Sequence, residues 1–329
     1  MDTIYIEQRV SEHPRTLAIV ARYPKARIIP IERYNEVFNN ASQNFRKQKQ
    51  NPALILAQKE GERVLPTPEQ YHIGGQHNYY FSHMLNCIYD CRYCFLQGMY
   101  RSANYVVFVN YEDFFADIKA KTILHEYPSW YFSGYDCDSL ALEPITQFVE
   151  HCLDAFSEIP QAWLELRTKS TQIRPLLKRP AIDNCVVAFS LSPEEIVQAE
   201  EHKTASLQKR IIALQQLQAH GWKIGLRFDP LIQASEFEII YGRMFEQVLS
   251  AIDIEAVHSV SLGPFRLPRD FHRKMIKLYP DSKLLSAQLE YNGMHVSYPK
   301  STETKMIDWC ESTLLDRIAP AQYFPCVSS

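Results

Sequence analysis

The sequence predicts an α/β protein: a partial (β/α)6 barrel, preceded by a small N-terminal αβ unit and followed by a C-terminal extension of helix, hairpin and helix. Three observations indicate this organisation. Short apolar segments alternate with amphipathic ones through residues 76–265, as in parallel sheets with crossover helices. Residues 1–75 carry a separate strand–helix pattern, and residues 266–329 follow a different order of elements.

The N-terminal unit is expected to contain three strands and two helices. Runs of β-branched and apolar residues predict strands at residues 5–6, 27–31 and 53–57. Residues with helical periodicity predict helices at 14–22 and 34–47.

Six strands and their crossover helices are expected in the barrel. The strands are placed at residues 79–83, 130–133, 163–168, 185–190, 223–228 and 257–262. The helices are placed at 111–123, 142–156, 206–220 and 237–252. The helix at 206–220 is well marked, because apolar residues recur at helical spacing and Gly221 follows its end. Chemistry in barrels lies at the C-terminal strand ends, so Arg227 and Asp229 either point into the mouth or form a buried salt bridge.

The C-terminal extension is expected to begin with a helix at residues 268–278. A hairpin at 289–297 turns at Asn292–Gly293, a dipeptide that favours tight turns. A final helix is expected at 303–318.

Composition excludes several classes of protein. A hydrophobic content of 46% is enough for a large core. The formal net charge of −3 gives no support for strong non-specific nucleic-acid binding, and the basic stretches at 46–49 and 178–179 are interpreted as solvated surface charge. No apolar run is long enough for a membrane span. The N-terminus lacks a secretory signal, so a cytoplasmic location is expected.

Three of the 8 cysteines lie together, at Cys87, Cys91 and Cys94, in the spacing C-x3-C-x2-C. In cytosolic proteins, grouped cysteines are more often metal ligands or catalytic groups than disulfides. Three thiolates on one loop can hold a [4Fe–4S] cluster and leave one iron without a protein ligand. S-adenosylmethionine (SAM) can chelate that iron, and an electron from the cluster then cleaves its sulfonium carbon–sulfur bond.

Two alternatives to an iron–sulfur cluster remain. Structural zinc usually has four ligands, and His83, shortly before Cys87, can supply the fourth. A coincidental grouping of cysteines is the second alternative. The aromatic Tyr93 before the last cysteine and the position of the motif after a strand favour the iron–sulfur site.

The residues around the motif resemble a known family. C-x3-C-x2-C with an aromatic before the third cysteine is the radical SAM signature, and the stretches 91–97 and 106–110 resemble the spore photoproduct lyase family in particular. Residues 134–142 are similar to its non-sporulating branch rather than to the true DNA-repair lyases. Further similarities cover nearly the whole chain, at residues 4–9, 166–170, 189–192, 220–225 and 278–280. The resemblance implies a radical SAM barrel.

The resemblance also implies roles for individual residues. The three cysteines would bind the cluster, and Lys169, Ser190 and Ser139 would contact SAM. Tyr93 would support hydrogen transfer or pack on the cofactor. Without the resemblance, Lys169 reads as a surface lysine and Ser190 as a hydroxyl that caps a loop.

The role of Cys137 has two interpretations. The DNA-repair lyases carry a cysteine in this region that gives a hydrogen atom to the substrate radical, which makes Cys137 a candidate catalytic residue. An ungapped alignment from Asp138 onward instead places Tyr135 at the donor position and makes Cys137 a small filler beside SAM. Phe95 stands where the lyases have Tyr, and the hairpin at 289–296 lacks their Arg–Tyr pair.

Three functions follow from these observations. The first is a radical SAM enzyme that cleaves SAM reductively and abstracts hydrogen from a substrate. Its partners would be SAM and an electron donor such as flavodoxin or ferredoxin, with no membrane and with only weak support for DNA. The second is a lyase for a thymine photoproduct in DNA. The third is a non-catalytic metal-binding scaffold.

Overall fold

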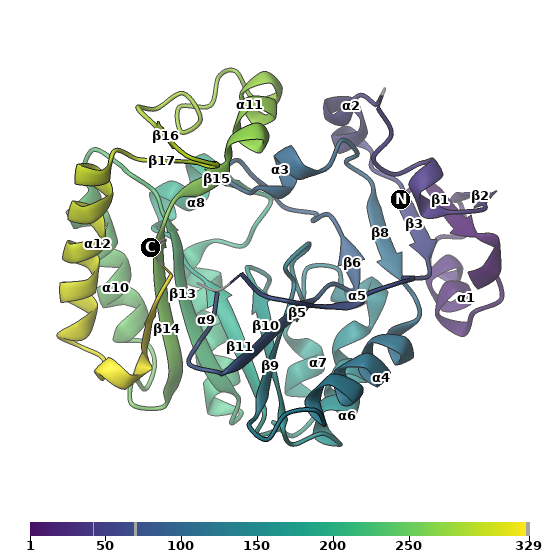
Figure 1. Cartoon of the computed structure of the whole chain (residues 1–329), viewed down its shortest axis with the longest axis horizontal. Coiled ribbons are helices and arrows are strands. Elements are labelled where there is room, and N and C mark those ends of the chain that lie inside the picture. Colours follow the sequence, from purple (N-terminus) through teal and green to yellow (C-terminus); the bar gives the residue numbers. More distant parts are fainter. Residues whose placement is uncertain (42, 69–70, 327–329) are drawn as a thin grey trace.

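Parallel strands in chain order form the central sheet (Figure 1). The computed structural model describes residues 1–41, 43–68 and 71–326. Within them the sheet has the order β18-β14-β13-β11-β10-β9-β5-β4. Its consecutive parallel strands are β5 (His77–Phe81), β9 (Ser129–Ser133), β10 (Ala162–Thr168), β11 (Cys185–Ser190), β13 (Lys223–Leu231) and β14 (Val257–Pro264). These are the strands predicted for the barrel, so the curled parallel sheet is confirmed.

Helices cover the outer face of this sheet (Figure 1). They are α4 (Tyr111–Thr122), α6 (Phe148–Ser157), α7 (Arg174–Leu177), α9 (Leu207–Ala219) and α10 (Phe237–Leu249), with the short helices α5 (Glu143–Thr146) and α8 (Glu194–Glu200) at strand ends. Ser206 begins α9, because its hydroxyl accepts a hydrogen bond from the Lys209 amide. The edges of the sheet are short strands, β4 (Val64–Pro66) and β18 (Tyr323–Pro325).

The inner face of the barrel carries buried charges. Arg227 on β13 pairs with Glu165 on β10 at 2.6 Å, and both side chains are almost fully buried. Arg227 also donates to the Ser259 hydroxyl on β14 at 2.9 Å. Asp229 pairs with Arg167 at 2.9 Å. Both Arg227 and Asp229 are therefore members of ion pairs inside the barrel.

A second sheet, of order β2-β1-β3-β8-β6, lies beside the barrel. It contains β1 (Thr3–Glu7), β2 (Arg27–Ile31) and β3 (Leu54–Ala57) from the N-terminal segment, and α1 (Pro14–Ala21) covers it. Its other strands, β6 (Met84–Leu85) and β8 (Tyr105–Phe108), come from the chain on either side of the cysteine motif. The motif therefore leaves from one sheet and returns to it.

The helix predicted at residues 34–47 is wrong. The chain forms a 3-10 turn, η2 (Tyr34–Glu36), and the short helix α2 (Phe45–Gln50). The buried carboxylate of Glu7 accepts the Tyr34 amide at 2.7 Å and holds that turn against β1. Asn39 then adopts a positive φ of 69°, which a helix does not tolerate.

The C-terminal extension has the predicted order. It contains β15 (Arg266–Pro268), α11 (Arg269–Leu278), the hairpin of β16 (Glu290–Asn292) and β17 (His295–Ser297), and α12 (Lys300–Leu315). The hairpin turns at Gly293, where φ is +59°. Helix α11 packs closely on α3 (Leu96–Met99), since a Cβ built on Gly98 would lie 2.5 Å from the Phe271 Cβ. Among the described residues, the helices are too short or too polar to cross a bilayer.

The substitution Arg227→Leu is expected to lower the free energy of unfolding by about 3–5 kcal/mol, because it leaves the Glu165 carboxylate buried without a partner. Urea denaturation followed by circular dichroism measures this loss. The double variant Arg227→Leu/Glu165→Leu removes both charges and should recover most of it. Equal instability of the single and double variants would contradict this account.

Candidate functional site

The cysteine motif occupies a loop between β6 and β8 that is fastened at two points. Asn86 turns the chain with a φ of +73°, and its side-chain amide donates to the carbonyl oxygens of Ser102 and Asn104 at 2.8 and 3.1 Å. Further along, β7 (Asp90–Cys91) pairs with β12 (Glu201–His202). The loop is thus shaped by main-chain contacts on both sides of Cys87.

The three cysteines lie at the edge of the main apolar core. Cys91 is buried, and Cys87 and Cys94 are partly exposed. Burial raises the pKa of all three thiols, while the Lys169 ammonium acts in the opposite direction on Cys91 and Cys94. Lys169 therefore lies within electrostatic reach of two of the sulfurs.

The three cysteines sit on one loop, where each thiolate could bind a different iron of a cubane cluster. Within residues 1–41, 43–68 and 71–326, no three His, Cys, Asp or Glu side chains converge as the ligands of one metal ion. A nearby cation also suits thiolates that carry negative charge.

His83 does not join the cysteines. Its ring stacks on Phe148 with centroids 3.7 Å apart and is almost completely buried. Burial lowers the pKa of His83 to about 3. The imidazole thus belongs to the core beneath α6, and the arrangement gives no support to a zinc site completed by His83.

Lys49 contacts the loop that carries Cys87, Cys91 and Cys94, called the cluster loop below. It is 13% exposed, its ammonium lies 3.0 Å from the Asp90 carboxylate, and it also contacts Gln97 at 3.3 Å. The interpretation of this basic stretch as solvated charge is therefore wrong for Lys49. The short helix α2 directs the side chain inward, and no motif in the sequence marks that contact.

Tyr93 faces the interior and meets a buried carboxylate. Its hydroxyl donates to Glu201, which also accepts from the Ser192 hydroxyl at 2.8 Å and pairs with Arg210. Burial by itself raises the pKa of Glu201, but Arg210 and Lys169 outweigh it and hold that pKa below its usual range. Glu201 and Arg210 were not anticipated from the sequence, because Glu201 reads as one more acid at the end of a polar helix.

Lys169 follows β10 directly, and Asp138 shapes the backbone around it. The buried Asp138 carboxylate accepts the Lys169 amide at 2.7 Å and the Thr168 hydroxyl at 2.6 Å. The Lys169 ammonium lies over the Tyr93 ring, 5.5 Å from its centroid. Ser139 is buried beside Asp138, and its hydroxyl donates to the Ser133 carbonyl oxygen at 3.0 Å. The structure thus brings Lys169 and Tyr93 together.

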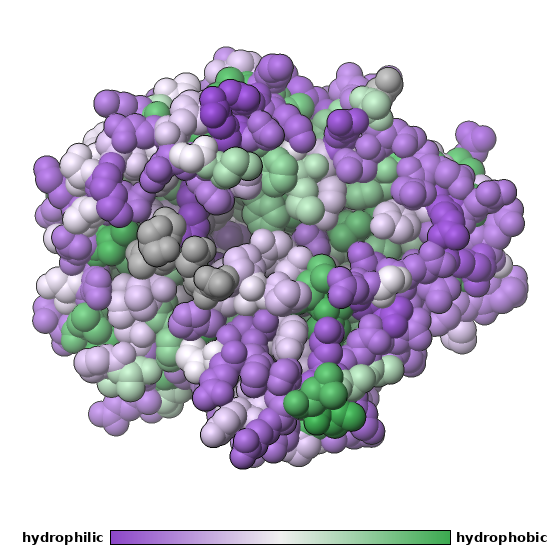
Figure 2. Space-filling model, viewed as in Figure 1, coloured by the Kyte–Doolittle hydropathy of each residue, from purple (hydrophilic) through white to green (hydrophobic). Residues whose placement is uncertain are grey.

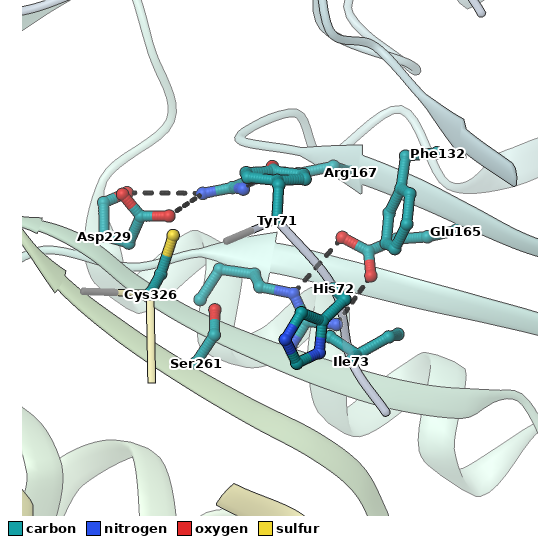
Figure 3. Close-up of a pocket in the computed structure, with 10 residues that line it drawn as sticks. Tyr71, His72, Ile73, Phe132, Glu165, Arg167, Asp229, Ser261 and Cys326 are labelled. Atoms are coloured by element: carbon teal, nitrogen blue, oxygen red, sulfur yellow. Dashed lines mark hydrogen bonds and ion pairs between the residues drawn. The ribbon is translucent and has the colours of Figure 1, made fainter. Parts of the chain in front are cut away.

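Ser190 ends β11 next to Arg167, which lines a small polar cavity of about 20 Å³ (Figure 3). Its hydroxyl accepts a hydrogen bond from Arg167 at 3.3 Å. Arg167 also contacts Asp229 and the Tyr71 hydroxyl. Cys326 lines the same cavity, with its sulfur on the side of Asp229 in Figure 3. Figure 2 shows that this face of the molecule is recessed near its centre.

Comparison with known proteins assigns the family. The model of the spore photoproduct lyase family matches residues 73–307. The chain belongs to the spore photoproduct lyase family.

The relatives cover most of the chain at low identity. The spore photoproduct lyase of Bacillus subtilis (strain 168) is 23% identical over 293 residues, which span 85% of this chain and 83% of that protein. The Geobacillus sp. (strain Y412MC61) enzyme is 23% identical over 204 residues, which span 60% of this chain and 59% of the relative.

The solved structures share the fold. A spore photoproduct lyase mutant with bound AdoMet (SAM) and dinucleoside spore photoproduct has a TM-score of 0.86 at 16% identity, covering 100% of this chain and 98% of that chain. A second structure, the lyase complexed with dinucleoside spore photoproduct, has a TM-score of 0.85 at 16% identity, covering 99% of this chain and 98% of that chain. The family is one of radical SAM enzymes that use a [4Fe–4S] cluster.

Cys137 and Tyr135 lie in different environments within this family fold. Cys137 is 7% exposed and packs in an apolar cluster that includes Met84 and Leu142. Tyr135 is partly exposed and stacks on Tyr80 with centroids 4.3 Å apart. Its ring also packs near that of Phe95, the residue directly after Cys94, with ring centroids 5.6 Å apart. Tyr135 therefore belongs to an aromatic wall next to the cluster loop.

The substitution His83→Phe should make stability less sensitive to acid. The folded protein protonates His83 only near pH 3, whereas the unfolded chain does so below about pH 6.5. This contribution to stability is complete above about pH 6.5 and is lost as the pH falls, by at most about 1.4 kcal/mol per pH unit. Unfolding free energies between about pH 7 and pH 5 should therefore fall less steeply in the variant.

The matched control is His295→Phe, at an exposed position in the hairpin. An unchanged acid slope in His83→Phe would show that His83 does not titrate in this way.

Proposed function

We propose that this chain cleaves SAM reductively and starts hydrogen abstraction on a substrate, with Cys87, Cys91 and Cys94 as the cluster ligands. When bound, the cluster supplies one electron to SAM. The observation that carries the proposal is the three-cysteine loop beside Lys169 at the C-terminal strand ends, in a chain of the spore photoproduct lyase family.

The protein's own residues would bind SAM and orient it. Lys169 supplies the positive charge that a SAM carboxylate needs, and Ser190 adds a hydroxyl from the next strand end. Ser139 belongs to the same layer of strand-end loops. Glu201 fixes the Tyr93 hydroxyl, so the ring stays beside the loop, where it can pack on the cofactor or support hydrogen transfer. A one-electron donor such as flavodoxin or ferredoxin is required.

Anaerobic reconstitution should give about four irons per chain and 5′-deoxyadenosine on reduction with SAM. The substitution Lys169→Ala should weaken SAM binding by about 10–100-fold, because it removes a charge-assisted hydrogen bond. Calorimetric titration with SAM measures this, and Lys169→Arg is the control that keeps the charge.

Uptake of zinc without iron would exclude the proposed chemistry. Uptake of iron with no SAM binding by the unsubstituted protein would favour a non-catalytic metal-binding scaffold.

A thymine-photoproduct lyase is the second candidate. The observation that favours it is the aromatic wall of Tyr80, Tyr135 and Phe95, whose rings offer faces on which a planar base can stack. A relative's structure contains dinucleoside spore photoproduct. Phe95 stands where the resemblance to the lyases expects Tyr, and residues 134–142 resemble the non-sporulating branch. Both departures favour a different substrate.

Incubation with dinucleoside photoproduct and SAM tests this candidate. Repair of the photoproduct to two thymidines that falls in Tyr135→Ala and persists in Tyr135→Phe would support a stacking role for the ring. Absence of restored thymidine under conditions that cleave SAM would remove the candidate.

A further inference from the structure

A hollow of about 400 Å³ lies beside Arg92 of the cluster loop, and Lys169 is not part of its lining. Its lining comes from four separate segments, namely α2, the cysteine motif, the end of α8 and the turn after α11. The residues that matter for charge are Arg46, Arg92, Glu200, Asp281 and Lys283.

The floor of this hollow is the cluster loop itself. Arg92 lies between Cys91 and Cys94 in sequence, and its amide donates to the Glu200 carbonyl oxygen at 2.8 Å. Its guanidinium lies over the Tyr279 ring, with the guanidinium carbon 4.0 Å from the ring centroid. Its neighbour Tyr93 points the opposite way and is buried against Glu201. One side of the loop thus faces the proposed SAM site, and the other faces the hollow.

The rim of the hollow is cationic in a chain of net charge −3. Arg46 and Lys283 are exposed and come from elements on opposite sides of it. Lys203, exposed beside His202, is close enough to lower the pKa of Asp90.

The opposing negative charges are fewer. Asp90 is paired with Lys49 and Arg92. The acidic lining residues are Glu200, which is partly buried, and Asp281, which is exposed, against the basic Arg46, Arg92 and Lys283.

We infer that this hollow docks a small acidic protein that carries one electron, and that the electron enters the cluster loop from the Arg92 side. The inference rests on the proposed function. In the transfer the carrier loses one electron and the cluster gains one, and no atom or proton changes place. Charge complementarity of this kind chiefly raises association rates and selects the partner.

The double variant Arg46→Glu/Lys283→Glu tests the assignment. With a reduced flavodoxin of net negative charge at low ionic strength, its rate of 5′-deoxyadenosine formation should fall by about tenfold or more. The difference from the unsubstituted protein should shrink as salt is added. With dithionite as reductant, the two proteins should have equal rates. Calorimetric titration with oxidised flavodoxin should show weaker binding, a readout that needs neither SAM nor turnover.

The matched control is Lys25→Glu/Lys119→Glu, which makes the same charge change at exposed positions on α4 and in the N-terminal unit. It should keep the flavodoxin rate and affinity of the unsubstituted protein.

Three outcomes would overturn the inference: an unchanged flavodoxin rate and affinity in the hollow variant, an equal loss in the control, or an equal loss with dithionite. Failure of the proposed function is distinct, since the unsubstituted protein would then form no 5′-deoxyadenosine with dithionite.

Discussion

The contact between Lys49 and Asp90 joins parts of the chain that are far apart in sequence, and it adds to the contacts of Asn86 and β7 that shape the cysteine loop. Lys49 comes from the N-terminal unit and Asp90 from the loop. Tyr279, after α11, reaches the same point, where its hydroxyl donates to Gln97 at 2.9 Å. A loop with three thiols cannot hold one shape by its own short-range contacts, so the N-terminal unit and the C-terminal extension both serve to position it.

The barrel beneath the loop contains paired charges where an ordinary core would be apolar. Arg227–Glu165, Arg210–Glu201 and Arg167–Asp229 are ion pairs between or beside its strands. A buried pair contributes little net stability compared with well-packed apolar residues. The contacts of these pairs suggest positioning instead, because Glu201 holds the Tyr93 hydroxyl and Arg167 holds the Ser190 hydroxyl.

The aromatic residues near the cluster loop bear on the substrate. Tyr135 extends a stack that reaches Phe95, immediately after the last cysteine, while Cys137 packs away in an apolar cluster. The rings of Tyr135 and Phe95 lie beside the loop, and the buried Cys137 thiol is also within electrostatic reach of it, because burial and then Cys87 raise the pKa of Cys137. The family provides the fold, and these side chains line the region beside the cysteine loop.

The sequence by itself determined the parallel barrel, the extension with its hairpin, the cysteine motif and the family. The strands, helices, hairpin and motif follow from local periodicity, turn residues or short spacing, which act over a few neighbouring residues. The family came from the resemblance of several short stretches to known sequences. The prediction of a helix at 34–47 was wrong because the carboxylate of Glu7, distant in sequence, accepts a hydrogen bond from the Tyr34 amide. Only the tertiary structure decided that Lys49 and Glu201 flank the cluster loop and that His83 is a core residue. The partners of a charged or polar side chain are chosen by packing between segments far apart in the chain, and such packing leaves no periodic trace in the sequence.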